Sequence, residues 1–306
     1  MRKFSVVIVA SQGLEKKSRQ HRLEECLRSL SQQAYPKDFF EIAVVDSGSG
    51  IEGRFLEDFG KSLALNLRYI DPSAGNIGPA KARNIGVKNS SFDFVAFIDD
   101  DATAPSDWLK IFDGAYDRYP ESAAVGGLTL PPPQLSKINI FAYFEEKLYK
   151  NYIKGGLMVE YLSIRRDEHP VFSGNISYSK KIFLDVGLFD ESFSPEIAGE
   201  DGDLKERILA RGGVFVFVPS VVIHHSLYTW ERFLVQQQSR GVSILRYRRH
   251  QGMENYRALN LLKLFISLFS LPALLLREKF DFRYSFVAWL SLVVRNWSKI
   301  CYYGKI

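Results

Sequence analysis

The first 130 residues alternate between short apolar runs and segments of helical periodicity. Four apolar runs have the length of strands, at 4–10, 41–46, 65–70 and 92–98. They are apolar along most of their length, as in parallel strands covered on both faces. Apolar residues at helical spacing and prolines near segment starts predict helices at 22–33, 79–90 and 106–119. This alternation predicts a doubly wound α/β domain, in which ligands bind at the carboxyl ends of the strands.

The middle of the chain is less regular. "LPPPQ" (130–134) interrupts the alternation and is followed by a predicted aromatic helix at 138–152. Residues 187–213 read as a loop that leads into a helix ending at Gly212. Residues 214–225 predict a strand or a pair of strands.

Two strongly apolar segments follow, at 259–276 and 284–294. In the first, the polar residues form one narrow helical stripe, made of Asn260, Lys263, Ser267 and Ser270. Its 18 residues are about the minimum that spans a bilayer, and the second segment is too short to do so. Together with flanking Lys and Arg, this favours two helices lying in a membrane interface. The alternative is that both helices pack on the globular core.

Charge is unevenly distributed along the chain. The overall net charge is +5, but residues 1–225 carry a net charge of −4 and residues 226–306 carry +9. The basic part is also the most apolar part, which favours an anionic membrane surface over nucleic acid. No RNP motif or C-x-x-C finger occurs, so we expect no nucleic-acid partner.

The two cysteines and the N-terminus bear on location. Cys26 and Cys301 lie far apart, suit a reducing compartment and have no metal-binding spacing. The N-terminal apolar run is short and lacks a small-residue cleavage site, so it is read as a first strand and not as a signal peptide. We therefore expect a cytoplasmic protein, peripheral at the inner face of the cell membrane.

Three consecutive carboxylates, Asp99, Asp100 and Asp101, follow the fourth predicted strand. A bound divalent cation would offset their mutual repulsion, and Mg²⁺ and Mn²⁺ prefer oxygen ligands. In extended backbone, residues i and i+2 point the same way. Asp99 and Asp101 are therefore expected to face one metal site, with Asp100 facing elsewhere.

Two other motifs allow different interpretations. "GSGIEG" (48–53) matches the dinucleotide pattern G-x-G-x-x-G, but it follows the second predicted strand and comes just after Asp46. "DDDAT" (99–103) resembles the nucleophile loop of haloacid-dehalogenase-like phosphatases, with Asp99 as nucleophile and Asp101 as general acid. "GEDGD" (199–203) could supply the later acidic pair of such a phosphatase.

Four segments in series resemble family 2 glycosyltransferases of the GT-A fold. These are "FSVVIVA", "EIAVVDSGSG", "NIGPAKARN…FIDDDA" and "VGLFDESFSPEIAGEDGDLKERILARGG". The resemblance covers roughly residues 4–225. It implies a GT-A domain over 1–225, with a nucleotide-binding half at 1–103 and an acceptor and catalytic half at 104–225. Residues 226–306 lie beyond the specific match and are expected to form a basic, apolar helical tail at the membrane.

The resemblance assigns residues one by one to the donor side. It implies contacts to the nucleotide-sugar from Ala10, Asp46, Lys81, Arg83, Asn84, Asp99 and Asp100. It implies a Mn²⁺ or Mg²⁺ site formed by Asp101, Asp99 and His224, with His225 as the alternative to His224.

On the acceptor side, Asp201 matches the general base, which would deprotonate the attacking hydroxyl and invert the anomeric configuration. The adjacent Glu200 is the secondary candidate and is expected to contact the acceptor. Both could instead be acids that favour a helix N-terminus. Gly174 and Asn175 match a small-residue turn facing the acceptor. Trp108 could stack on a sugar or pack in the core.

The sequence departs from the family pattern at two donor-side positions. "VASQG" ends the first strand, and "VVDSGSG" lacks the second acid of its loop. From the resemblance as a whole, the predicted function is an inverting, metal-dependent transferase that uses a nucleotide-diphospho-sugar, with a UDP-sugar favoured. Its acceptor would be a glycan or a lipid-linked molecule of cell-surface polysaccharide or glycoconjugate biosynthesis. A sugar-nucleotide-binding protein without catalysis is the non-enzymatic alternative.

Overall fold

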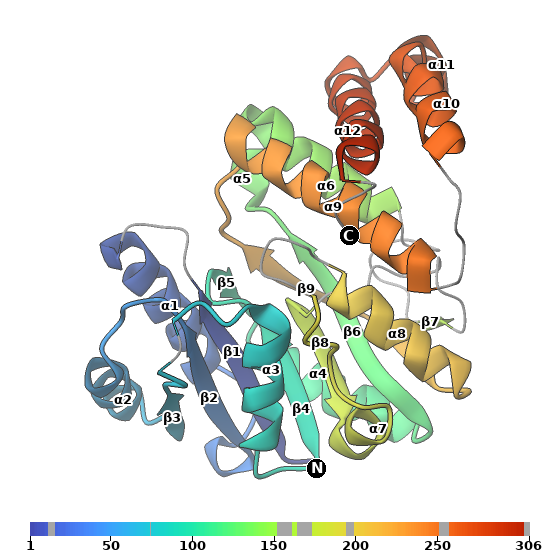
Figure 1. Cartoon of the computed structure of the whole chain (residues 1–306). Helices are drawn as coiled ribbons and strands as arrows, with labels where there is room; N and C mark the ends of the chain where they lie inside the picture. The colour runs from blue at the N-terminus through green and yellow to red at the C-terminus, as the bar shows by residue number, and fades with distance from the viewer. Residues whose placement is uncertain are drawn as a thin grey trace. The chain divides into compact units, whose positions relative to one another are not determined.

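The computed structural model describes residues 1–11, 16–73, 75–151, 161–163, 173–193, 199–250 and 257–302. The chain divides into two compact units (Figure 1). The first unit comprises Met1–Leu130, Tyr149–Pro195 and Glu200–Ser226. The second comprises Pro131–Leu148, Glu196–Gly199 and Leu227–Ile306.

Among the described residues, the first unit contains one nine-stranded mixed sheet. Its strands are β1 (Phe4–Ser11), β2 (Phe40–Ser47), β3 (Leu67–Ile70), β4 (Phe94–Ile98), β5 (Ala102–Thr103), β6 (Ser122–Leu130), β7 (Tyr161–Ser163), β8 (Asn175–Ser179) and β9 (Val214–His224). The order is β3-β2-β1-β4-β8-β6-β9-β5, with β7 on β9. The first four strands are parallel, as predicted, and β8 is antiparallel to both β4 and β6.

Two hydrophobic clusters cover opposite faces of the sheet because side chains alternate along each strand. On β1, Phe4, Val6 and Ile8 join the cluster that contains α1 (Lys16–Ser31), α2 (Gly53–Ser62) and α4 (Trp108–Arg118). Val7 joins the second cluster, which contains α3 (Pro79–Lys88), α7 (Lys180–Asp185) and α8 (Glu200–Ala210). The α/β class with helices on both faces is therefore confirmed.

Several elements were not predicted. The strands β5, β6 and β8 and the helices α2 and α9 (Trp230–His250) had no expected counterpart. At the predicted turn, Gly174 does lie in a turn, and Asn175 is the first residue of β8, in the middle of the sheet. Residues 214–224 form one long strand.

The second unit is helical. It contains α5 (Pro133–Ile138), most of α6 (Ile140–Asn151), α9, α10 (Arg257–Leu268), α11 (Leu271–Arg277) and α12 (Phe282–Cys301). Its core is built on Phe144, Phe233, Tyr284 and Val287. The sequence placed residues 131–148 in the catalytic half, whereas the structure packs them with the C-terminal helices. Asp281 at the start of α12 accepts hydrogen bonds from Tyr143 (2.6 Å) and Lys147 (2.8 Å).

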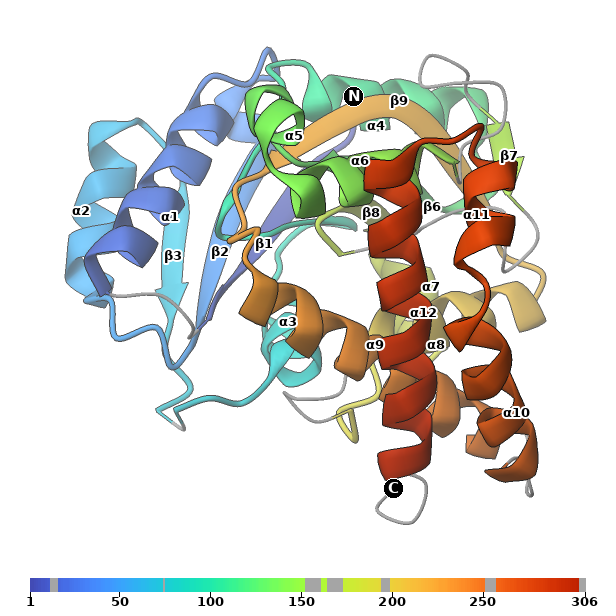
Figure 2. The ribbon, with the colours of Figure 1, turned by 90° about the horizontal axis from the view of Figure 1, so that it is seen from above.

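The predicted helix at 259–276 is two helices, α10 and α11, that meet at an angle of 68°. Figure 2 shows α10 and α11 alongside the long helix α12, which contains the second apolar segment. Within the described residues, no single helix has the length and apolar character needed to cross a bilayer. By these two criteria alone, the bent pair α10–α11 does.

Candidate active site

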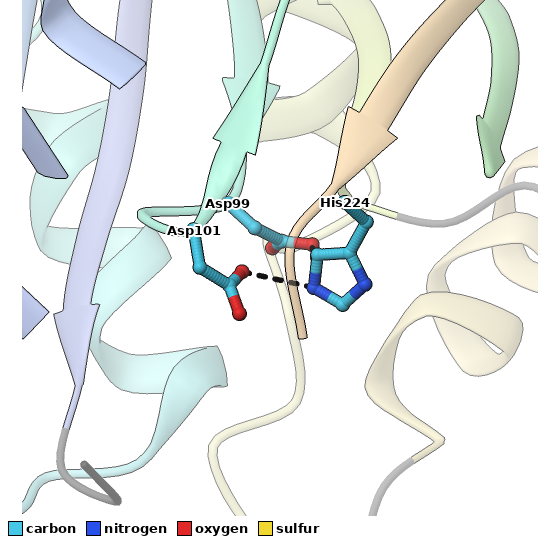
Figure 3. A group of neighbouring side chains, drawn as sticks. All are labelled: Asp99, Asp101 and His224. Atoms are coloured by element: carbon cyan, nitrogen blue, oxygen red, sulfur yellow. Dashed lines mark ion pairs between the residues drawn. The ribbon is translucent and has the colours of Figure 1, made fainter. Parts of the chain in front are cut away.

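Three predicted metal ligands meet at the ends of neighbouring elements (Figure 3). Asp99 directly follows β4, and His224 is the last residue of β9. Asp101 precedes β5, whose Ala102 pairs with His224 in the sheet. The His224 Nε2 atom lies 2.9 Å from Asp101 Oδ1 and 3.8 Å from Asp99 Oδ2. The donor atoms of the three side chains all lie within 4.8 Å of one another.

This donor set fits a divalent cation. It offers two carboxylates and one imidazole, a combination that suits Mn²⁺ and Mg²⁺ sites completed by substrate oxygens. Burial raises the pKa of Asp99, and the neighbouring Asp101 carboxylate acts in the same direction, against His224 and Arg83. A cation would offset that unfavourable concentration of negative charge. Asp99, Asp101 and His224 are therefore the residues that would hold it.

The other two candidates in this region face away from the cluster. Asp100 accepts a hydrogen bond from the backbone amide of Ser11 at the end of β1 (3.0 Å), as the alternation of side chains predicts. The His225 Nε2 atom lies 3.2 Å from Thr103 Oγ1. Of the two adjacent histidines, the structure therefore brings His224 to the acidic cluster.

Asp201 lies in the first turn of α8, where the partial positive charge of the helix favours a carboxylate. Both oxygens accept hydrogen bonds from Ser173, one from its hydroxyl and one from its amide (3.4 Å). Burial raises the pKa of Asp201 to about 6, and the neighbouring Glu200 carboxylate acts in the same direction. Arg83 and Ser173 oppose this rise. A carboxylate in this range can accept a proton near neutral pH.

Arg83 connects the two acidic groups. Its Nη1 atom lies 2.6 Å from Glu200 Oε1 and 3.8 Å from Asp201 Oδ1, and its Nη2 atom lies 3.9 Å from Asp99 Oδ1. Its guanidinium also lies over the ring of Phe189. One buried cation from α3 therefore holds the first turn of α8 close to the aspartate that follows β4.

Glu200 does not have the expected acceptor contact. Its side chain is buried and directed at Arg83. Its observed role is to hold Arg83.

The remaining donor-side candidates differ in how the structure places them. Asp46 is the second-last residue of β2, is half-buried and accepts a hydrogen bond from the amide of Ser49 (2.7 Å). Ala10 has no exposed surface and pairs with Asp46 in the sheet. Lys81 is exposed and lies two residues before Arg83, about 200° around the helix. Nucleotide contacts by Asp46, Ala10 and Lys81 stay predictions.

Three predicted substrate contacts are wrong because the side chains are buried and fully engaged. Asn84 bonds the backbone of Phe189 in both directions, at 2.9 and 3.0 Å. Asn175 donates to the carbonyls of Leu128 (2.7 Å) and Ser220 (3.0 Å). Trp108 has no exposed surface and donates to Asn175 Oδ1 at 2.8 Å. The core alternative for Trp108 is therefore the correct one.

Gly174 contributes to the site because its missing side chain leaves room for the Asp99 carboxylate. A Cβ atom here would lie 2.5 Å from Asp99 Oδ2 and 3.2 Å from Thr129 Oγ1. Glycine therefore lets the Asp99 carboxylate lie against the backbone at the start of β8. Sequence reasoning missed the preceding residue, Ser173, although it directly precedes Gly174 and has the donor that a carboxylate needs.

We expect Asn175→Ala to lower the free energy of unfolding by about 1–3 kcal/mol for each buried partner left unsatisfied. The carbonyls of Leu128 and Ser220 and the indole of Trp108 would all lose a partner. Urea unfolding monitored by circular dichroism measures this. Trp108→Phe, which removes one of the three bonds, should cost less. Unchanged stability combined with a raised acceptor KM would instead support the substrate contacts that the structure contradicts.

Comparison with known proteins decides the family. The family model described as glycosyl transferase family 2 matches residues 5–166, more than half of the chain. The chain belongs to glycosyltransferase family 2. This membership excludes the phosphatase interpretation of "DDDAT" and the dinucleotide interpretation of "GSGIEG". The motif "GSGIEG" follows the second strand, β2, and leads into α2. The acidic cluster follows a different strand, β4.

A curated relative of this glycosyltransferase is the glucosyl-dolichyl phosphate glucuronosyltransferase of Haloferax volcanii. The two are 29% identical over 198 residues, which is 64% of this chain and 58% of the relative. The chain thus spans somewhat more than half the length of that relative.

Two solved structures show the same fold. A Pyrobaculum calidifontis mannosyltransferase in complex with GDP-Man and Mn²⁺ is 15% identical, with a TM-score of 0.65 over 99% of this chain and 88% of that one. S. aureus TarS in complex with UDP-GlcNAc is 19% identical, with a TM-score of 0.50 over 79% of this chain and 66% of that one. The GT-A fold predicted from the sequence is confirmed.

Proposed function

We propose that this glycosyltransferase moves a sugar from a nucleotide-diphospho-sugar to an acceptor hydroxyl in one inverting, metal-dependent displacement. The observation that carries this proposal is the link made by Arg83. It lies between the Asp99–Asp101–His224 cluster and Asp201. The donor pole, which is the Asp99–Asp101–His224 cluster, and the pole of the general base, which is Asp201, therefore belong to one site.

Each pole has the chemistry that its half of the reaction needs. When bound, a divalent cation neutralises negative charge that develops on a departing diphosphate. Asp201 accepts the proton of the acceptor hydroxyl, whose acidity rises as the new bond forms. Ser173 fixes the orientation of the Asp201 carboxylate through two hydrogen bonds. Attack from the face opposite the diphosphate inverts the configuration at the anomeric carbon.

The donor class is supported by the ligands of structural neighbours. Two structural neighbours are in complex with UDP-GlcNAc and GDP-Man, the second also with Mn²⁺. These support a nucleotide-sugar donor and a Mn²⁺ or Mg²⁺ cofactor, and we favour a UDP-sugar.

For the acceptor, we propose a glycan or a lipid-linked sugar of cell-surface polysaccharide or glycoconjugate biosynthesis. The name of the glucuronosyltransferase, which cites glucosyl-dolichyl phosphate, supports a lipid-linked acceptor.

A donor screen tests this function. The full chain is heated with UDP-sugars and GDP-sugars, each with Mn²⁺, Mg²⁺ or a chelator, and release of the nucleoside diphosphate is assayed in parallel. We expect one nucleotide series to raise Tm, because a ligand at ~100 times its Kd stabilises the folded state by about 2.7 kcal/mol. This rise should occur only with metal, because the cation would join the diphosphate to the protein. Metal-independent binding would contradict the proposed site. Binding without turnover, with any acceptor offered, would favour a non-catalytic sugar-nucleotide-binding protein.

A further inference from the structure

The helix α10 has inverted polarity. On α10, Asn260 and Ser267 are buried, although soluble helices normally expose such residues. The apolar residues of the same helix and its end are instead 46–68% exposed. We call these residues the apolar face: Leu261, Leu262, Phe265, Ile266, Leu268 and Phe269. Two of the four residues of the predicted polar stripe, Asn260 and Ser267, therefore point inward, and the other two, Lys263 and Ser270, are half-buried.

The inward side of this helix pair is held together by polar contacts. Asn296 of α12 donates to the carbonyl of Lys263 on α10 (3.2 Å), and the indole of Trp289 donates to the carbonyl of Leu268 (3.4 Å). On α12, a further set of polar side chains is buried, made of Ser285, Ser291, Asn296, Ser298 and Lys299. Polar residues between helices and apolar residues outside are typical of helices in contact with lipid.

The apolar surface continues past the bend between α10 and α11. Leu276, Phe280 and Phe282 around the α11–α12 turn are 61–72% exposed. Exposed cationic side chains accompany them in the same turn, Arg277, Lys279 and Arg283. A cationic rim beside an apolar surface is complementary to a bilayer with anionic headgroups. Arg277 also pairs with Glu278 at 3.0 Å, and Arg283 lies over the ring of Tyr143.

We propose that the apolar face of α10, together with α11, inserts into one leaflet of an anionic membrane, with Arg277, Lys279 and Arg283 at the headgroups. The sequence predicted the stripe and an interfacial position but no direction for the stripe. Here Asn260 and Ser267 are buried on the inward side, and the apolar face on the outer side of α10 is available to lipid. Because the cytoplasmic leaflet is the anionic one in cells, this surface would place the protein at the inner face of the membrane. The proposal is independent of the proposed catalysis.

A flotation experiment with the full chain tests this surface. It compares vesicles of phosphatidylcholine alone with vesicles that also contain about 30% phosphatidylglycerol, an anionic lipid. We expect the wild type to float with the anionic vesicles. Leu262→Ser/Phe265→Ser should weaken partitioning at least about tenfold, since it removes exposed apolar area that lipid would cover. Arg277→Gln/Lys279→Gln should weaken it roughly 30-fold at low salt.

A matched control uses the same side-chain changes elsewhere. Leu184→Ser/Phe55→Ser replaces exposed apolar residues of the first unit and should leave flotation unchanged. Circular dichroism and donor-induced Tm shifts verify that each variant is folded. Equal flotation of the Leu262→Ser/Phe265→Ser variant overturns the proposal. A lipid-free dimer that this variant dissociates, with no flotation of the wild type, overturns it in favour of a second copy as the occupant.

Discussion

Asp201→Asn is expected to lower kcat for sugar transfer by about 10²–10⁴-fold, the usual contribution of a positioned general base. Asparagine keeps the size of the side chain and can still contact Ser173, but it cannot accept the acceptor proton. The donor does not depend on that proton, so its Kd should change little. Single-turnover transfer and donor titration, performed on the same preparation, separate the two effects.

The pH dependence gives a second readout of the same residue. Burial raises the pKa of Asp201 to about 6, and only the deprotonated form can act as base. The rate should therefore be level above this pH and fall about tenfold for each pH unit below it. In the Asp201→Asn variant, this slope should disappear from the residual activity.

Asp203→Asn is the matched control for both measurements. Asp203 lies on the same helix two residues further on, and its carboxylate pairs with Arg207 at 2.8 Å, away from Arg83. We expect nearly wild-type rates and the wild-type pH profile. If Asp203→Asn reduces transfer as much as Asp201→Asn does, the effect comes from the stability of α8 and the assignment of the base is wrong.

Asp101→Ala is expected to lower the apparent affinity for Mn²⁺ at least about 100-fold, because even residues that only support a ligand contribute 10–100-fold. Donor binding should fall with it, since the cation would join the diphosphate to the protein. Donor titrations at several Mn²⁺ concentrations, with a chelator as the zero point, measure both. Donor affinity that survives chelation would show that the acidic cluster works without a cation.

The two adjacent histidines give a sharp control for the metal site. His224 Nε2 lies 2.9 Å from Asp101, whereas the ring of His225 is directed at Thr103. His224→Ala should therefore resemble Asp101→Ala, and His225→Ala should retain metal-dependent donor binding. The reverse order would mean that His225 turns toward the cation on binding.

Local patterns along the chain were sufficient for the parallel half of the sheet. The first four strands were found because a run such as "FVAFI" is buried on both faces, which makes it apolar without any reference to the rest of the chain. The strands β6 and β8 were missed because they contain Ser, Gly, Asn and Ala, which become strand residues only through their neighbours in the sheet.

The site divides in the same way. The acidic residues Asp99, Asp101 and Asp201 were recognisable because their motifs are contiguous in sequence. The link through Arg83 joins residues 117 positions apart, so no local pattern could reveal it. Local patterns also could not reveal that Asn84, Asn175 and Trp108 are buried. The family resemblance suggested substrate contacts for Asn84 and Asn175, and the ring of Trp108 suggested stacking on a sugar. The structure instead uses their polar atoms to bond backbone and side-chain groups within the core.

The sequence by itself determined the family, the α/β class, the acidic motifs and the existence of a polar stripe on the helix at 259–276. Only the tertiary structure decided which histidine meets Asp101 and which way that stripe points. The physical reason is that periodicity fixes which residues share a helix face, whereas the partner packed against the helix decides whether that face is inside or outside. Here the partner is α12, whose Asn296 donates to the backbone carbonyl of Lys263. Asn260 and Ser267 of α10 are buried, and its apolar face is left exposed.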